Sequence, residues 1–461
     1  MESLLIEVGT EELPPKSLKK LYLAFSDNIT QLLTKNGVQI GESIAYATPR
    51  RLSVVIKNVA EKQNDRIDER KGPSTVHAYD EKGEPTQAAT GFARSCGVDL
   101  SELSTTKSSE GEWLYHSQKI EGVALNEILP GLILEALKTL PVAKKMRWSD
   151  KKDEFVRPIQ WLVILHGDRL VPATLMGISS NNVTRGHRFH GQREIVIPSA
   201  KLYEEELRVK GCVIPSFEER KRRVIDEIRQ MNERLNAKIE LDDNLLDEVV
   251  GLVEWPTLVM GSFDKHFLSL PDEVLISSMQ KHQKYFPVRS NEDILTNDFV
   301  TVCNIESNDP DIVRQGNERV IRPRLADAEF FFRTDTSKPL ESHQEYLGRM
   351  TFQKKLGTLL DKTKRVTVIA SEISELCNAK QMETNRAAQL SRCDLLSEMV
   401  GEFPDLQGVM GGYYAEKDGE NSEVCLAIKE FYHPRFSGDT IPSTPTGRCI
   451  TLADKIDSIV G

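Results

Sequence analysis

Several features that commonly reveal a function are missing from this sequence of 461 residues. It contains seven cysteines, an odd number, and no two of them have CxxC spacing. This pattern argues for free thiols in a reducing cytoplasm, against a disulfide framework and against a thiolate zinc site. We also find no P-loop, no Rossmann glycine fingerprint and no kinase-like glycine loop, so the chain offers no familiar nucleotide-binding motif.

Long hydrophobic runs are missing as well. No apolar stretch approaches the roughly 18 residues that a membrane helix needs, so we expect no association with a membrane. The first residues, MESLLIEVGTEEL, are acidic and lack the basic region of a signal peptide. Together with the cysteine pattern, these features predict a cytoplasmic location.

An excess of positive charge is the third absence, because the net charge is −10. Proteins dedicated to nucleic-acid binding usually have a basic balance. If this chain binds RNA, it must do so through local basic patches on a generally acidic body. A hydrophobic content of 39% and a charged content of 28% are typical of a soluble globular protein, and the length predicts two to four domains.

The most distinctive segment that is present reads RPRLADAEFFF, from Arg322 to Phe332. The planar fork of arginine donates two parallel hydrogen bonds to a phosphate, so Arg322 and Arg324 are candidates for binding RNA. The phenylalanine run would bury the end of the segment and hold the arginines in place. The alternative is a buried element whose arginines pair with Asp327 and Glu329.

Other candidates for RNA contact are short basic clusters, several of them beside aromatic residues. That composition binds phosphate and stacks bases, although each cluster alone is more often a solvated face. The candidates are Arg50, Arg51, Lys144, Lys145, Arg147, Arg185, Arg188, Lys281 and Lys284.

The segment RGHRFHG, from Arg185 to Gly191, leaves three interpretations open. His187 and His190 have a spacing that would place both on one face of a helix, as metal ligands could require. The surrounding glycines favour a loop or a strand instead. The other two interpretations are a basic turn that contacts RNA or carboxylates, and a purely structural turn.

Hydrophobic periodicity predicts a multidomain α+β protein. Residues 1–60 read as strand, helix and strand, and residues 217–236 (FEERKRRVIDEIRQMNERLN) read as a helix with apolar residues on one face. From about residue 340 the pattern becomes helical. We predict an N-terminal α/β segment (1–60), a mixed α/β region (61–150), a middle domain (151–335) and an all-helical domain (340–461).

A series of short segments, spread from residue 4 to residue 457, resembles the beta subunit of bacterial heterotetrameric glycyl-tRNA synthetases. Their order makes the resemblance specific and extends it over almost the whole chain. The segments are LLIEVGTEELPPKSL, ATPRRL, KGP, KKMRWSD, FVRPIQWLV, RGHRFHG, LVEWP, QKYFPV, CNIESNDP, RPRLADAEFFF, LGTLLDKTKR, QGVMGGYYA and LADKID.

This resemblance implies a subunit that binds tRNA(Gly) and does not activate glycine. In the family, glycine is activated with ATP and Mg²⁺ on a separate alpha subunit of an α2β2 complex, so no cofactor and no catalytic residue are expected on this chain. The absence of an HxGH-type signature of class I synthetases, and of a clear class II arginine motif, points the same way. We therefore expect the chain to position tRNA for glycylation at an active site on the alpha subunit.

The resemblance also implies folds for the two later parts. Residues 151–335 resemble the B3/B4 module of phenylalanyl-tRNA synthetase beta subunits, and residues 340–461 resemble an HD domain. Cys393 and Asp394 stand where HD phosphohydrolases have a His-Asp metal-binding pair, and Asp454 matches their final Asp. Without either histidine we expect no metal. The alternatives are an HD-type metal phosphohydrolase and a scaffold for a partner enzyme that does not touch RNA.

The sequence ends at Gly461, after a pattern typical of the middle of an apolar-faced helix. The family's beta subunits are longer, with further helical structure and a C-terminal anticodon-binding domain. We therefore expect the HD-like domain to be cut short and the anticodon-binding region to be missing.

Overall fold

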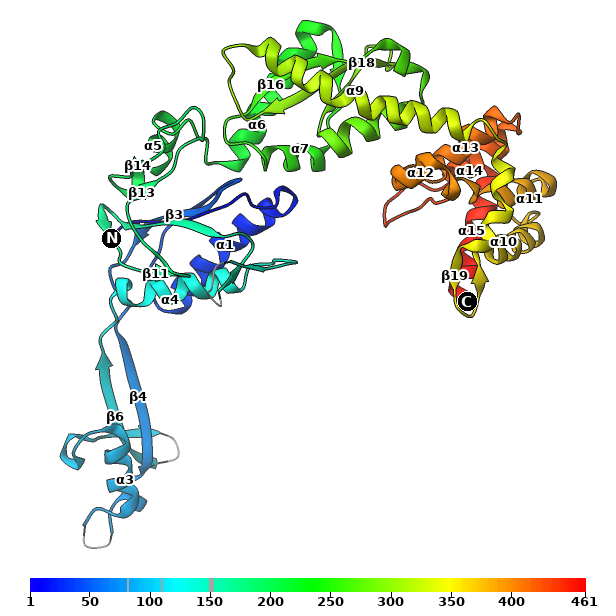
Figure 1. The fold of residues 1–461 in the computed structure, drawn as a ribbon. Coiled ribbons are helices and arrows are strands. Elements are labelled where there is room, and N and C mark those ends of the chain that lie inside the picture. Colours follow the sequence, from blue (N-terminus) through cyan, green and yellow to red (C-terminus); the bar gives the residue numbers. More distant parts are fainter. Residues whose placement is uncertain (81–82, 109–110, 149–152) are drawn as a thin grey trace. The chain divides into compact units, whose positions relative to one another are not determined.

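The computed structural model describes residues 1–80, 83–108, 111–148 and 153–461 (Figure 1). The chain divides into two compact units, Met1–Arg223 with Leu246–Pro256, and Val224–Leu245 with Thr257–Gly461. Both combine helices with small sheets, which confirms a multidomain α+β protein. The boundaries of the four parts drawn from the sequence remain a prediction.

A five-stranded antiparallel sheet organises the first unit, in the order β10-β9-β1-β3-β2. Its strands are β1 (Glu2–Thr10), β2 (Ser43–Thr48), β3 (Arg51–Val59), β9 (Ile159–His166) and β10 (Arg169–Leu170). β1 pairs with both β3 and β9, and every residue from Ser3 to Thr10 is buried. This explains why the sequence of β1 is almost continuously apolar rather than alternating.

Helices cover both faces of this sheet. α1 (Pro15–Lys35) begins at a proline, ends just before Gly37 with its φ of +73°, and packs against β2 and β3 beside α4 (Leu125–Lys138) (Figure 1). Proline suits the first turn of a helix, and glycine accepts the positive φ that follows the end. The short helices η2 (Ala200–Leu202) and α5 (Tyr203–Val209) lie on the other face.

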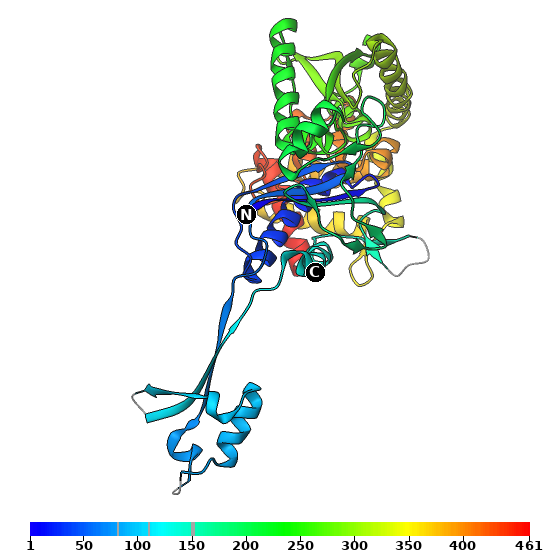
Figure 2. The same ribbon diagram turned by 90° about the vertical axis from the view of Figure 1, so that its left-hand side faces the viewer.

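The segment between residues 66 and 120 forms its own small sheet, in the order β4-β6-β5. β4 (Arg66–Ser74) and β6 (Gly111–Ile120) run side by side over most of their length (Figure 2). β5 (Ser104–Ser108), α2 (Thr75–Ala78), α3 (Gln87–Cys96) and η1 (Leu100–Glu102) complete it around a core of Ala78, Ala89 and Leu114.

The rest of the first unit contains short elements. Three two-stranded pairs consist of β7 (Met146–Arg147) with β8 (Glu154–Phe155), β11 (Thr174–Leu175) with β12 (Ile178–Ser179), and β13 (Val183–Thr184) with β14 (Ile195–Val196).

The predicted amphipathic helix is α6 (Phe217–Leu235), and α7 (Asp243–Val250) follows it. In sequence, both helices begin in one unit and end in the other.

The second unit contains an antiparallel sheet in the order β15-β17-β18-β16, followed by helices. The strands are β15 (Ala237–Ile239), β16 (Thr257–Ser262), β17 (Phe286–Ser290) and β18 (Leu295–Cys303), with η3 (Lys265–Ser269), α8 (Asp272–Ser277) and the π-helix η4 (Ser278–Gln283) between β16 and β17. The RPRLADAEFFF segment lies within the long helix α9 (Pro310–Asp335), which packs against β16. Asp309 caps α9 by accepting a hydrogen bond of 3.3 Å from the N–H of Ile312.

The region after α9 is mainly helical. Its elements are η5 (Leu340–His343), η6 (Glu345–Arg349), α10 (Leu359–Ile373), α11 (Gln381–Leu390), η7 (Cys393–Leu396), α12 (Glu398–Glu402), η8 (Pro404–Leu406), α13 (Val409–Lys417), α14 (Ser422–Glu430) and α15 (Pro445–Val460). No helix in the described residues is long and apolar enough to cross a membrane.

The prediction that residues 340–461 are all helical is wrong at one place. A hairpin of β19 (Thr351–Gln353) and β20 (Gly357–Thr358) precedes α10. The side-chain oxygen of Gln353 accepts hydrogen bonds from the N–H groups of Lys355 (2.6 Å) and Leu356 (3.1 Å), and Gly357 takes a φ of +85°. These local turn contacts are not visible in hydrophobic periodicity.

Candidate nucleic-acid interface

The two arginines of ATPRRL are buried. Arg51 is fully buried at the start of β3, and Arg50 is 8% exposed. Arg50 donates to Glu254 at 2.6 Å and to the carbonyl of Gly186 at 2.8 Å. Arg51 donates to Glu254 at 3.2 Å and to the carbonyl of Arg185 at 2.7 Å. Segments far apart in the sequence therefore meet in one buried network.

Glu7 of β1 belongs to the same network. Its carboxylate lies 3.8 Å from the guanidinium of Arg51, and it accepts hydrogen bonds from Thr184 (2.5 Å) and from the indole of Trp161. Burial opposes the charge on Arg51, but Glu254 and Glu7 outweigh it and raise the arginine pKa. Burial likewise favours neutral Glu254, yet Arg51 and Arg50 hold its pKa below the usual range. The network is a buried set of charges that stabilise one another.

We therefore correct the prediction that Arg50 and Arg51 contact tRNA. A guanidinium without exposed surface has no donor to offer to a phosphate in solution. The signal that could have revealed this is an acid within an apolar segment: Glu7 in the strand LLIEVG, and Glu254 in the bend LVEWP. Buried carboxylates need cations or several hydrogen-bond donors nearby. Acids in such apolar segments therefore predict that Glu7 and Glu254 pair with basic side chains inside the protein.

RGHRFHG forms a tight turn packed on Gly211. The N–H of His187 donates to the carbonyl of Gly211 at 2.8 Å, and a side chain on Gly191 would come within 2.0 Å of the same oxygen. His187 is buried and stacks on the exposed His190 with ring centres 5.0 Å apart. Arg188 is exposed and lies 3.5 Å from Glu11 and 3.4 Å from Glu12. Of the three interpretations, this geometry favours a structural turn whose basic side chain contacts carboxylates.

Arg185, the first residue of that turn, is half-buried. Its guanidinium lies 5.0 Å from the ring centre of Trp161, and its carbonyl accepts the hydrogen bond from Arg51. Lys144, Lys145 and Arg147, by contrast, are all exposed around β7. Arg147 pairs with Glu154 of β8 at 2.6 Å. The structure thus brings Arg185 into the buried network and leaves the KKMR cluster at the surface.

The remaining basic candidates lie in the second unit, where Lys281, Arg322 and Arg324 each pair with a carboxylate. Lys281 lies 2.5 Å from Asp405, Arg322 lies 3.5 Å from Asp264, and Arg324 lies 3.4 Å from Glu402. The Nζ of Lys284 donates to the carbonyl of Lys281 at 3.0 Å. Lys281, Arg322 and Arg324 keep roughly half of their side chains or more in solvent, so they can still meet a phosphate.

Two expectations for the α9 segment are wrong. The carboxylates that pair with Arg322 and Arg324 are Asp264 and Glu402, not Asp327 and Glu329. The phenylalanine run does not bury the end of the segment uniformly, because Phe330 is 60% exposed while the next two are partly buried against the apolar core. Consecutive residues of a helix point in different directions, so three adjacent phenylalanines cannot share one buried face.

The three positions matched to an HD metal site do not converge on an ion. Asp394 accepts hydrogen bonds from the N–H groups of Gly408 (2.5 Å) and Gly411 (3.0 Å). Asp454 is paired instead with Arg392 and, at 3.0 Å, with Lys362. Burial, followed by Asp394, raises the pKa of the Cys393 thiol to about 12.

No group of three or more His, Cys, Asp or Glu side chains is arranged to hold a metal ion in the part of the chain that the structure describes. Around Asp454, the positive charge comes from side chains of the protein itself. A lysine ammonium and a guanidinium already neutralise this carboxylate, so it has little to offer a divalent ion. The alternative of an HD-type metal phosphohydrolase has no support from this arrangement.

Asp394 supplies a testable pH dependence. Burial raises its pKa from 3.8 to about 6, although the N–H groups of Gly408 and Gly411 oppose the shift. Because the folded-state pKa lies above the unfolded one, the stabilisation is complete below about pH 4 and is lost as pH rises through about 6. The stability of the unaltered chain, relative to Asp394→Asn, should fall by about 1 kcal/mol between about pH 5 and about pH 7. Urea unfolding of both proteins at the two pH values measures this, and a constant or rising difference would contradict it.

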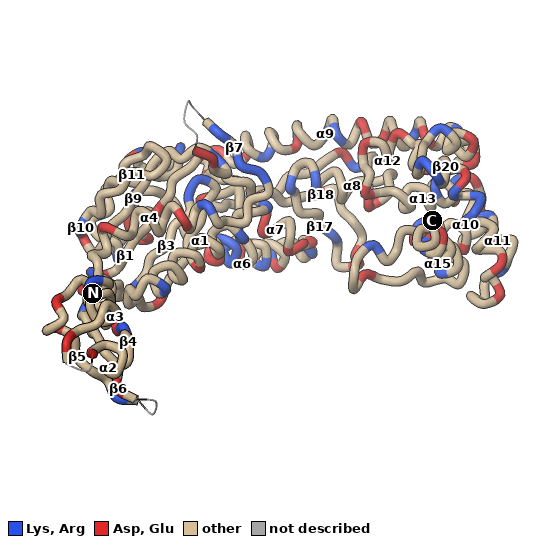
Figure 3. The backbone as a smooth tube through the Cα atoms, turned by 90° about the horizontal axis from the view of Figure 1, so that it is seen from below, with Lys and Arg blue, Asp and Glu red and all other residues tan. Residues whose placement is uncertain are grey.

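A basic and aromatic surface that the sequence did not single out surrounds the β19–β20 hairpin, and Figure 3 shows the basic residues of the backbone near β20. Lys354 and Lys355 are exposed in its turn, and no carboxylate in the described residues pairs with either. Phe352 is 37% exposed, and Tyr346 of η6 is 50% exposed. The guanidinium of Arg349 lies 4.9 Å from the ring centre of Tyr346. We call Tyr346, Arg349, Phe352, Lys354 and Lys355 the hairpin surface.

The hairpin surface is held by local contacts. Thr358 and Asp361 form a capping box at the start of α10, in which Thr358 accepts from the N–H of Asp361 at 3.2 Å and Asp361 accepts from the N–H of Thr358 at 2.9 Å. The carboxylate of Asp361 is thereby directed to the backbone. Exposed cations beside exposed rings are the combination that binds phosphates and stacks unpaired bases.

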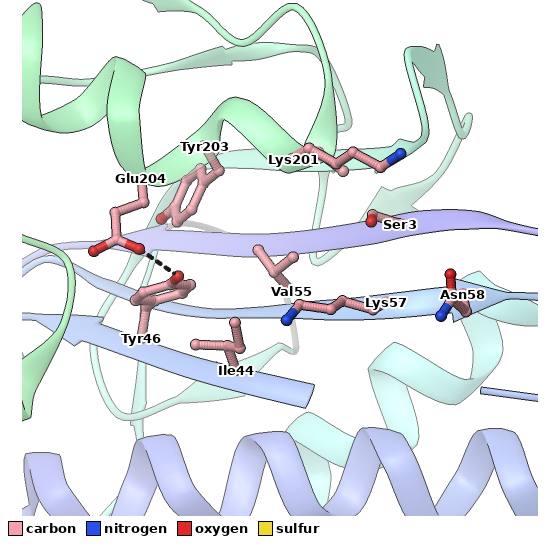
Figure 4. Close-up of a pocket in the computed structure, with 10 residues that line it drawn as sticks. Ser3, Ile44, Tyr46, Val55, Lys57, Asn58, Lys201, Tyr203 and Glu204 are labelled. Carbon is pink, nitrogen blue, oxygen red and sulfur yellow. Dashed lines mark hydrogen bonds between the residues drawn. The ribbon is translucent and has the colours of Figure 1, made fainter. Parts of the chain in front are cut away.

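A cavity of about 310 Å³ lies in the first unit between the sheet and α5 (Figure 4). The hydroxyl of Tyr46 donates to Glu204 at 2.8 Å across it. Burial, and then Glu204, raise the pKa of Tyr46 above its usual range. Two lysines line the cavity, and both are neutralised: Lys57 by Glu42 at 2.8 Å, and Lys201 by Glu2 at 3.7 Å. This cavity therefore has no excess charge with which to attract an anionic ligand.

The fold defines the class, a multidomain α+β protein, and its surface carries exposed basic groups beside aromatic rings. Comparison with known proteins then gives the family. The family model described as glycyl-tRNA synthetase beta subunit matches residues 4–461, and the chain belongs to this family. The resemblance found in its short motifs is thereby confirmed.

Similar proteins named glycine–tRNA ligase beta subunit occur in several bacteria. The protein of Marinobacter nauticus is 45% identical over 461 residues, which cover 100% of this chain and 66% of that protein. Those of Colwellia psychrerythraea (45%) and Proteus mirabilis (43%) match over 460 residues, 100% of this chain and 67% of each relative. The chain thus spans about two thirds of the length of these relatives.

Proposed function

We propose that this chain is the tRNA-binding, non-activating beta subunit of a glycine–tRNA ligase. In this role it holds tRNA(Gly) so that the acceptor end reaches an active site on an alpha subunit, within an α2β2 complex of the cytoplasm. ATP and Mg²⁺ bind to the alpha subunit and not to this chain. Membership of the beta subunit family supports the role, as does the name that the relatives carry.

The hairpin surface is the observation that carries the RNA-binding part of the proposal. On a chain with a net charge of −10, exposed cations without a carboxylate partner are the places where a polyanion can approach. Lys354 and Lys355 meet this condition, and Tyr346 and Phe352 add ring faces on which bases can stack. Arg322 and Arg324 of α9, whose side chains are 66% and 45% exposed, are further candidates.

The proposed contribution to the reaction is orientation. Glycine is first joined to AMP and then transferred to the terminal ribose of the tRNA, and both steps take place on the alpha subunit. A subunit that fixes the acceptor end beside the glycyl-adenylate converts an encounter between two molecules into a reaction within one complex. Positioning of this kind lowers a barrier by several kcal/mol without supplying a chemical group.

The proposal includes two finer assignments of fold. We assign residues 340–461 to a degenerate HD-like domain and residues 151–335 to a B3/B4-like module. The helices α10 to α15 around buried Asp394 are consistent with the first assignment. In this reading, the pairs of Asp454 with Lys362 and Arg392 replace a metal ion by internal cations, and the domain serves as a scaffold for RNA binding.

Glycylation assays test the proposal directly. We would measure tRNA charging by an alpha subunit alone, by alpha with this chain, and by alpha with a full-length beta subunit, using this chain alone as the blank. Activity with this chain is the expected result if it both docks alpha and places the acceptor end. Activity only with the longer subunit would place the indispensable tRNA contact outside these 461 residues. No activity in either mixture would contradict the proposed role.

A further inference from the structure

A second pocket of the first unit, of about 430 Å³, has an unusual distribution of charge. It lies between the first turns of α1 and the segments that follow α4 and β8. Three cations line it: Lys144, Lys145 and Arg157. Among the described residues that line the pocket, none is acidic. Figure 3 shows the basic stretch of backbone at β7.

The hydrogen bonds of these cations lead to backbone carbonyls, apart from a weak one of 4.0 Å from Arg157 to the thioether sulfur of Met146. Lys145 donates to the carbonyl of Lys138 at 3.1 Å, and Arg157 donates to the carbonyls of Glu12 (3.0 Å) and Val156 (3.1 Å). In the described part of the chain, no carboxylate forms an ion pair with Lys144, Lys145 or Arg157. The neighbouring carboxylates are engaged elsewhere: Glu154 pairs with Arg147 and Glu12 pairs with Arg188. The pocket therefore presents positive charge that no described carboxylate neutralises.

The walls of the pocket are aliphatic. Leu21 and Val156 are buried at its base, Val142 is half-buried, and Met146 is 39% exposed. No aromatic side chain is found among the lining residues that the structure describes. A nucleotide would find cations here but no ring on which to stack, in contrast to the hairpin surface. The better match is a carboxylate attached to an aliphatic body.

We propose that this pocket receives an acidic, aliphatic segment of the alpha subunit. The inference rests on the proposed pairing with an alpha subunit and assigns that partner a docking site. A carboxylate of the segment would lie among Lys144, Lys145 and Arg157, and an aliphatic side chain beside it would cover Met146 and Val142. Charge complementarity supports this occupant, because a concentrated positive patch on an acidic protein both steers and orients a negatively charged partner.

The test compares three variants in binding to a purified alpha subunit and, in parallel, to tRNA(Gly). Lys144→Glu with Lys145→Glu reverses the charge, and Met146→Glu places a carboxylate in the aliphatic wall. The matched control is Lys20→Glu with Lys35→Glu, two exposed lysines of α1 that do not line this pocket. Thermal unfolding by circular dichroism verifies that each variant is folded.

We expect each pocket variant to weaken alpha binding by about tenfold or more, and the control to change it by less than about twofold. Binding of tRNA should stay within about twofold in all variants. Unchanged alpha binding by the folded pocket variants would overturn the inference and leave the proposed function standing. Loss of tRNA binding without loss of alpha binding would also overturn it, because the pocket would then be an RNA site. No alpha binding by the unaltered chain would overturn both proposals.

Discussion

Replacing Arg51 by methionine should lower the free energy of unfolding of the first unit by about 3–5 kcal/mol. Methionine fills a similar volume but removes, among the described residues, the only cation that pairs with Glu7, and it also removes a cation that pairs with Glu254. Both carboxylates are at most 2% exposed, so water cannot replace the lost partner. Urea unfolding followed by circular dichroism and by tryptophan fluorescence measures the loss, since Trp161 lies 5.6 Å from Arg51.

Arg169→Met provides the matched control for this prediction. Arg169 also pairs with a glutamate, Glu61, but both side chains are more than half exposed. An exposed pair contributes about 0–1 kcal/mol, so the control should be nearly as stable as the unaltered chain. Adding Glu254→Gln to Arg51→Met should recover part of the loss, because it removes one buried charge. Equal effects of Arg51→Met and Arg169→Met would show that the buried network does not hold this part of the fold.

Arg51 also illustrates why local sequence was misleading here. A pair of arginines after a proline has the composition of an RNA-binding turn, and no carboxylate partner of Arg51 lies close to it in the sequence. Glu254 lies about two hundred positions further along the chain, and only the folding of the sheet brings it to Arg51. The elements themselves were more predictable, because their signals are local. An apolar run predicts β1, and a pair of prolines and a later glycine mark the start and the end of α1.

The candidate site likewise has one part that the sequence predicts and one part that it does not. The exposure of Lys144, Lys145, Arg322 and Arg324 agrees with their composition, since charged residues outside apolar patterns are usually at the surface. The hairpin surface escaped notice because its two rings and three cations come from η6, β19 and a turn, without helical or alternating spacing. Its signal was the turn itself: QKKLG combines a side-chain acceptor with a glycine at a positive φ.

Lys354→Glu with Lys355→Glu is expected to weaken tRNA binding by about 10- to 100-fold at moderate salt. Each lysine that meets a phosphate releases about one counterion, so the slope of the logarithm of the binding constant against that of the salt concentration should fall by about 1.5–2. Both side chains lie in an exposed turn whose backbone is held by Gln353, so stability should change by less than about 0.5 kcal/mol. Filter binding or fluorescence anisotropy with labelled tRNA(Gly) at several salt concentrations measures both quantities.

A substitution at Phe352 distinguishes the contribution of base stacking to tRNA binding from the contribution of charge in the same experiment. Phe352→Ala removes an exposed ring without changing the net charge, so we expect a loss of about 1–3 kcal/mol in binding free energy with an unchanged salt slope. Lys20→Glu with Lys35→Glu serves as a charge-matched control in the first unit and should bind almost as the unaltered chain does. If this control weakens binding as much as the hairpin variant, the loss reflects net charge and not a local contact. If neither the lysine nor the phenylalanine variant alters binding, tRNA meets this chain elsewhere, and the exposed arginines of α9, Arg322 and Arg324, become the first place to look.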